Sequence, residues 1–90
     1  MSNNVKSLLD ESKNYSEDII PKISDILDDL GIEHETNSEE TEIVLSNVTQ
    51  NADSLNDEIT AKIDVPKMVF AVLIDITVVD GVGYIRQKTK

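Results

Sequence analysis

The chain has 90 residues, of which 18 are Asp or Glu and 8 are Lys or Arg, giving a formal net charge of −10 at pH 7. This length predicts one small domain, and a hydrophobic content of 39% allows a modest aliphatic core. The absence of cysteine excludes disulfides, thiolate metal sites and thiol catalysis. Because so acidic a chain repels phosphate groups, we also expect no direct binding of nucleic acid.

Apolar side chains recur at intervals of three and four over residues 5–30, which predicts helix. Pro21 cannot lie deep inside an uninterrupted helix, because its ring clashes with the preceding turn and it donates no hydrogen bond. We therefore expect a break or kink near residues 16–18, with helices at about 4–14 and 18–30. Ser16 or Asp18 would cap the second helix, and Gly31 would end it in the left-handed conformation.

Residues 32–42 are polar and acidic and have no apolar period, so they are predicted to be a solvated connector. Residues 42–49 alternate moderately between apolar and polar side chains, which indicates a first strand. A loop or a single helical turn is expected over residues 50–56.

Apolar and polar side chains alternate strictly over residues 58–65, as in a half-buried strand. Pro66-Lys67 would link this strand to a long β-branched strand over 68–79, and Asp80-Gly81 is a hairpin signal that leads to a return strand over 82–88. This register places Asp75 opposite Arg86.

The predicted fold class is α+β: two N-terminal helices, or one kinked helix, packed on a three- to four-stranded antiparallel β-meander. Residues 1–90 would form a single small domain, with a helical part over about 4–30, an acidic connector over 32–42 and a sheet part over about 42–89.

One face of the predicted meander is nearly pure hydrocarbon and would form the core beneath the helices. The opposite face is mixed, and its apolar side chains need a cover. The candidates for an oligomer or partner face are Val69, Leu73, Val79, Val82 and Tyr84. Alternatively, the first strand or a helix of the same chain wraps behind the sheet and buries them.

Negative charge is concentrated in residues 10–42, where twelve acidic side chains stand against two lysines. Several of these acids approach the C-terminal end of the second predicted helix, where the helix dipole disfavours negative charge; such a departure from local rules is typical of a functional surface. The residues predicted to bind a basic protein partner are Asp25, Asp28, Asp29, Glu33 and Glu35. The alternative is a solvated face that keeps a small protein soluble.

The same acidic residues lie close in sequence to His34, the only imidazole in the chain. Their spacing does not match a calcium-binding loop, and a lone histidine in a polar segment is expected to be solvated, so we predict no metal and no cofactor. Nucleophilic catalysis would need a positioned base, and no glycine-rich phosphate loop precedes a helix. We therefore predict no catalytic residues and no enzymatic activity.

The longest apolar stretch, residues 68–79, is interrupted by Asp75 and Thr77 and falls short of the roughly 20 residues of a membrane helix. The first residues lack the pattern of a signal peptide, so we expect a cytoplasmic protein without membrane association. The function favoured by the sequence is a non-enzymatic acidic interaction module that docks on a basic, nucleic-acid-binding protein, with inhibition as one form of its action. The alternative is a small structural or assembly subunit that homo-oligomerises through the second face of its sheet.

Overall fold

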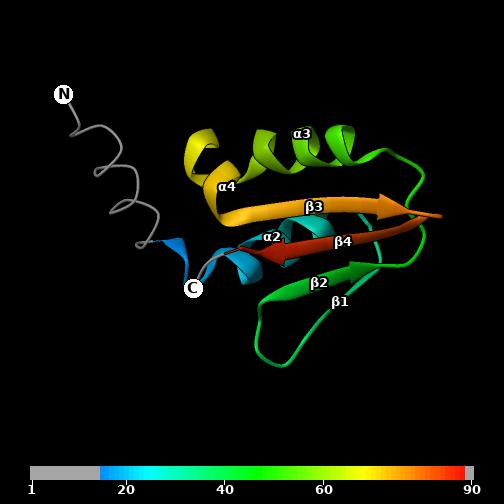
Figure 1. Cartoon of the computed structure of the whole chain (residues 1–90), viewed down its shortest axis with the longest axis horizontal. Helices are drawn as coiled ribbons and strands as arrows, with labels where there is room; N and C mark the ends of the chain where they lie inside the picture. Colours follow the sequence, from blue (N-terminus) through cyan, green and yellow to red (C-terminus); the bar gives the residue numbers. More distant parts are fainter. Residues whose placement is uncertain (1–14, 89–90) are drawn as a thin grey trace.

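The computed structural model describes residues 15–88, which form an α+β domain of three helices and a four-stranded antiparallel sheet (Figure 1). In chain order the elements are α2 (Ile19–Asp29), β1 (His34–Thr36), β2 (Glu42–Leu45), α3 (Ala52–Lys62), α4 (Lys67–Leu73), β3 (Ile74–Val79) and β4 (Val82–Gln87). The predicted α+β class with an antiparallel sheet is confirmed. The predicted arrangement of N-terminal helices followed by a meander is wrong, because the helices are interleaved with the strands and the sheet order is β1-β2-β4-β3. The helix predicted over 4–14 lies outside the described residues.

Helix α2 confirms the predicted apolar stripe and its predicted end. Its five buried side chains follow the helical spacing, and Pro21 falls in its first turn, where a proline is tolerated. Gly31 adopts a φ of +74°, and its N–H donates to Asp28 O while the Ile32 N–H donates to Leu27 O. These two bonds and the left-handed glycine form a Schellman motif, which satisfies carbonyl groups of the last turn and reverses the chain.

The strand predicted over residues 58–65 is wrong, because residues 52–62 form helix α3. The Asn51 side chain accepts a hydrogen bond from the Ser54 N–H and so caps the first turn. Leu55 and Ile59, four residues apart, are the buried side chains of this helix, whereas Ala61 is exposed. The alternation over residues 58–65 is therefore compatible with a helix as well as a strand. The Asn51 cap and the four-residue spacing of Leu55 and Ile59 favour the helix.

The prediction of one strand over residues 68–79 is wrong in its first half. Lys67–Leu73 form α4, whose buried side chains Val69, Phe70 and Leu73 have helical spacing. The chain then becomes extended at Ile74, which begins β3. A continuous apolar run fits either a buried strand or a short buried helix, and here tertiary packing selects both in succession.

The predicted hairpin is confirmed in its turn and register. Asp80 and Gly81 both have positive φ angles, of 52° and 78°, as a type I′ turn requires. Val79 pairs with Val82, and Asp75 lies opposite Arg86.

The predicted first strand is confirmed over residues 42–45, where β2 pairs with the other side of β4. The connector prediction is wrong for residues 34–36, which form the edge strand β1.

Within residues 15–88, the helices cover one face of the sheet. Ile43 and Leu45 of β2 and Ile85 of β4 are fully buried and belong to a core cluster with side chains from all three helices. The alternate residues Val44 and Tyr84 are only half-buried, which identifies the opposite face as the open one. In Figure 1, α2 lies behind β4, while α3 runs beside β3. None of the described helices is long and apolar enough to cross a membrane.

Candidate functional site

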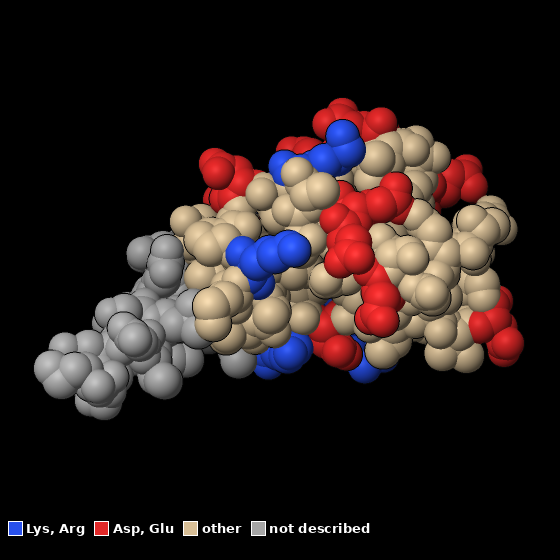
Figure 2. All heavy atoms as spheres, turned by 90° about the horizontal axis from the view of Figure 1, so that it is seen from above, with Lys and Arg blue, Asp and Glu red and all other residues tan. Residues whose placement is uncertain are grey.

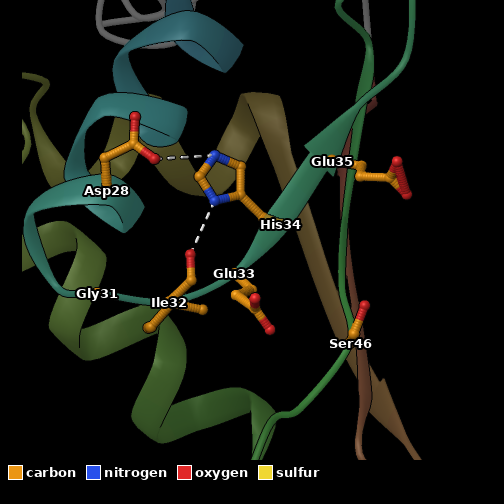
Figure 3. A pocket seen from close by; sticks show the side chains of 7 residues that line it. All are labelled: Asp28, Gly31, Ile32, Glu33, His34, Glu35 and Ser46. Carbon is orange, nitrogen blue, oxygen red and sulfur yellow. Dashed lines mark hydrogen bonds and ion pairs between the residues drawn. The ribbon is translucent and has the colours of Figure 1, made fainter.

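A hollow of about 500 Å³ lies beside the C-terminal end of α2 and the chain that leads into β1 (Figure 3). It is lined by Asp28, Gly31, Ile32, Glu33, His34, Glu35 and Ser46. Five of these residues are consecutive, so the hollow follows the chain from the end of the helix into the edge strand.

The Schellman motif explains why acidic residues from two elements meet at this hollow. Gly31 reverses the chain after α2, and open space surrounds the position that its Cβ would occupy. The following residues then run back beside the last turn of the helix. Asp28 from α2 and Glu33 and Glu35 from the returning chain therefore line one hollow.

His34, the first residue of β1, forms a hydrogen bond through each nitrogen of its ring, and the bond of Nε2 reaches α2. Because a carbonyl oxygen can only accept, Nδ1 donates to Ile32 O at 2.9 Å. In the neutral ring Nε2 then accepts from the Ser24 hydroxyl at 2.7 Å, and Asp28 Oδ1 lies 3.7 Å from the same nitrogen. The His34 side chain is 8% exposed, so the expectation of a solvated histidine is wrong. The ring positions the edge strand.

The structure brings together three of the five residues predicted to bind a basic partner. Asp28, with its side chain 71% exposed, Glu33 and Glu35 line the hollow, whereas Asp25 and Asp29 are exposed on α2 outside its lining. None of the described residues that line the hollow is Lys or Arg. The last turn of α2 also contains no basic residue, so the negative end of its dipole adds to the charge of the carboxylates.

Acidic side chains are not confined to the hollow. They also form a band across the face seen from above in Figure 2. Any test of the hollow must therefore compare it with acidic residues elsewhere on the surface, since charge alone does not distinguish them.

The five residues predicted to form an apolar interaction face do not lie on one surface. Val69 and Leu73 belong to α4 and are buried in the core, so their placement on an exposed sheet face is wrong. Val79 is 58% exposed at the end of β3, and Val82 and Tyr84 are half-buried on β4. These three remain candidates for an interaction face on the open side of the sheet.

The open face carries a polar row beside these apolar residues. Arg86 Nε donates to Glu42 Oε2 at 2.8 Å, and its guanidinium lies 5.8 Å from the centre of the Tyr84 ring.

Within residues 15–88, no group of three or more His, Asp or Glu side chains is arranged to hold a metal ion.

Sequence reasoning missed the parts of the site that depend on tertiary pairing. Ser24 and Ser46 are isolated serines in the sequence, and nothing in their neighbourhood predicts that Ser24 bonds to His34 or that Ser46 lines the hollow. His34-Glu35-Thr36 is too short for a period to be recognised. The usable signal was Gly31, whose predicted left-handed conformation implies that the chain turns back along α2.

Comparison of the chain with protein-family models, with curated proteins and with solved structures found no match.

Proposed function

We propose that this protein is a non-enzymatic interaction module that binds a basic protein through the acidic hollow. The observation that carries the proposal is the convergence of Asp28, Glu33 and Glu35, from two elements, on a hollow whose described lining contains no cation. Acids that only maintain solubility have no reason to converge in this way, because dispersed charges serve that purpose with less mutual repulsion.

The magnitudes favour fast and salt-sensitive association. An exposed ion pair contributes roughly 0.2–1 kcal/mol, and the end of a helix dipole adds about 0.3–1 kcal/mol. Three carboxylates and one helix end around the same hollow therefore contribute a moderate favourable free energy to the binding of a Lys or Arg side chain. The surrounding negative potential also raises the association rate of a cationic partner.

The chemistry of the partner follows from the same charges. A nucleic-acid-binding protein carries a basic surface that neutralises phosphates, and that surface complements the hollow. When bound to that basic surface, this protein would compete with the nucleic acid and so inhibit its binding.

Reversal of the hollow's charge tests the proposal. In one variant Asp28, Glu33 and Glu35 are replaced by Lys; in a matched control, the exposed residues Asp57, Asp64 and Asp75, which lie outside the hollow, are replaced by Lys. Both variants change the net charge equally. Titration calorimetry with a lysine-rich peptide at low salt should give at least about tenfold weaker binding for the hollow variant than for the control. Equal weakening of both would contradict the proposal.

A second function, self-assembly through the open sheet face, is favoured by one observation: Val79 is 58% exposed beside half-buried Val82 and Tyr84. Light scattering after gel filtration would then give a dimer or larger species that resists high salt. Val79→Lys should dissociate it, and Ala61→Lys, an equal change of charge at an exposed position of α3, serves as the control. A monomer at both low and high salt contradicts self-assembly.

A further inference from the structure

The two edges of the sheet differ in how they are covered. Strands β3 and β1 are the edges in the order β1-β2-β4-β3. Helix α3 contacts β3 and runs beside it (Figure 1), whereas among the described strands β1 pairs with β2 alone, and Glu35 and Thr36 are exposed. An uncovered edge strand is a template for a further strand.

The hydrogen-bond register identifies which backbone groups of β1 face outward. The Asn37 N–H donates to Glu42 O at 3.1 Å, so residues 37 and 42 form a hydrogen-bonded pair. Bonded and non-bonded pairs alternate in an antiparallel ladder, and Glu35 opposite Val44 is therefore the next bonded pair. The N–H and C=O groups of His34 and Thr36 consequently point away from β2, toward the free edge.

The other side of β2 gives an independent check of this register. The Gln87 N–H donates to Thr41 O at 2.9 Å, which makes residues 41 and 87 a bonded pair between β2 and β4. Odd-numbered residues of β2 therefore bond to β4, and even-numbered ones bond to β1. Both observations agree that Val44 faces Glu35.

The charges beside this edge specify what kind of strand fits. The His34 ring and Asp28 lie toward α2, whereas Glu35, the next residue in the strand, projects to the other side (Figure 3). Side chains of an added strand also alternate, so they would meet Asp28 on one side and Glu33 and Glu35 on the other. Lys or Arg is the complement on both sides. A second copy of this chain is disfavoured, because pairing β1 with β1 would bring the same carboxylates together.

We infer that an extended, Lys- or Arg-rich segment of the partner adds to β1 as a fifth strand. Its backbone pairs with the outward N–H and C=O groups of His34 and Thr36, and its cationic side chains lie against the acids of the hollow. This inference rests on the proposed function and adds the binding mode: main-chain pairing fixes the segment, and the carboxylates select its charge.

Two peptides of equal charge separate strand addition from attraction between charges. The first is a nine-residue peptide of sequence Lys-Lys-Thr-Thr-Lys-Lys-Thr-Thr-Lys, capped at both ends, which places Lys on both faces of an extended strand. The second has the same sequence but is N-methylated at every internal backbone nitrogen, which removes the N–H groups from both strand edges. Calorimetry with the native protein should give at least about tenfold weaker binding of the methylated peptide. Hydrogen exchange at the Thr36 amide should slow with the first peptide only.

A protein variant tests the same contact from the other side. Thr36→Pro removes an outward N–H and no bond within the sheet, so the fold tolerates it as it would any edge proline. Thr36→Pro should weaken the binding of the first peptide about tenfold, whereas Thr36→Val, which retains the N–H, should leave its affinity unchanged. If Thr36→Pro does not fold, the comparison of the two peptides on the native protein decides alone.

The outcomes distinguish the binding mode from the proposed function. Equal affinity for the two peptides, together with lost binding when the hollow acids are reversed, would overturn strand addition and leave the acidic interaction site intact. Binding that is insensitive to the hollow acids, or no binding of either peptide at low salt, would overturn both.

Discussion

The two edges of the sheet differ in the contacts that hold them and in the charge of their surface. At β3, helices α3 and α4 contribute fully buried apolar side chains, including Leu55, Ile59 and Phe70, to the core. At β1, contacts with α2 depend on the hydrogen bonds of His34, and the surface is acidic. Changes at the β3 edge should therefore alter the free energy of unfolding, whereas changes at the β1 edge should alter binding.

The largest expected effect is at Phe70, the only phenylalanine of the chain, which is 1% exposed in α4. Phe70→Ala should lower the free energy of unfolding by about 3–5 kcal/mol, because it removes buried area and leaves a cavity. Met68→Ala is the matched control on the same helix, since Met68 is 68% exposed and its truncation should change stability by less than about 0.5 kcal/mol. Urea unfolding measures both, and similar losses would contradict the assignment of Phe70 to the core.

The contrast between these edges also explains which parts of the fold could be predicted. Helix α2 was predictable because its stripe, its early proline and its terminal glycine agree with one another. The hairpin was predictable because Asp80-Gly81 fixes both turn type and register. In each case a local signal and the apolar pattern specify the same structure.

The segment of residues 52–73 could not be predicted, because its local signals conflict. Alternation over 58–65 indicates a strand, whereas the Asn51 cap and the spacing of Leu55 and Ile59 indicate a helix. The burial that decides between them comes from the packing of α3 against α2 and β3, two elements that lie outside this segment. The acids of the hollow were predictable as a charged group, but their arrangement along a free edge required the pairing of β1 with β2.

A smaller effect is expected where β1 joins α2. His34→Ala removes the acceptor of the Ser24 hydroxyl and the donor to Ile32 O, so it should cost about 1–3 kcal/mol. Hydrogen exchange should become faster at the backbone amides of β1 while those of the β3–β4 hairpin remain protected. Glu35→Ala, at the neighbouring exposed position, should leave exchange unchanged. Uniform loss of protection in both regions would show that β1 is not a separate unit.

Substitutions of Gly31, in the turn beside the hollow, should change stability through backbone strain and not through side-chain crowding. Gly31→Val should cost about 1–2 kcal/mol, because a β-branched residue is strained at a φ of +74° even though nothing crowds the Cβ position. Gly31→Asn should be close to neutral, since Asn tolerates the left-handed conformation. Thermal unfolding of the two variants measures the difference, and equal losses would indicate that side-chain crowding governs the position.

The smallest change in stability is expected from the acids to which we assign binding in the proposed function. Asp28→Asn, Glu33→Gln and Glu35→Gln together should change the free energy of unfolding by less than about 0.5 kcal/mol, because the Asp28 carboxylate is mostly exposed and the glutamates lie at the surface. Removing mutual repulsion and the unfavourable contact with the helix dipole should make that change a gain at low salt. The same variant should bind the lysine-rich peptide at least about tenfold more weakly. A marked loss of stability would show that these carboxylates stabilise the fold. It would contradict the expectation that changes at the β1 edge alter binding and not the free energy of unfolding.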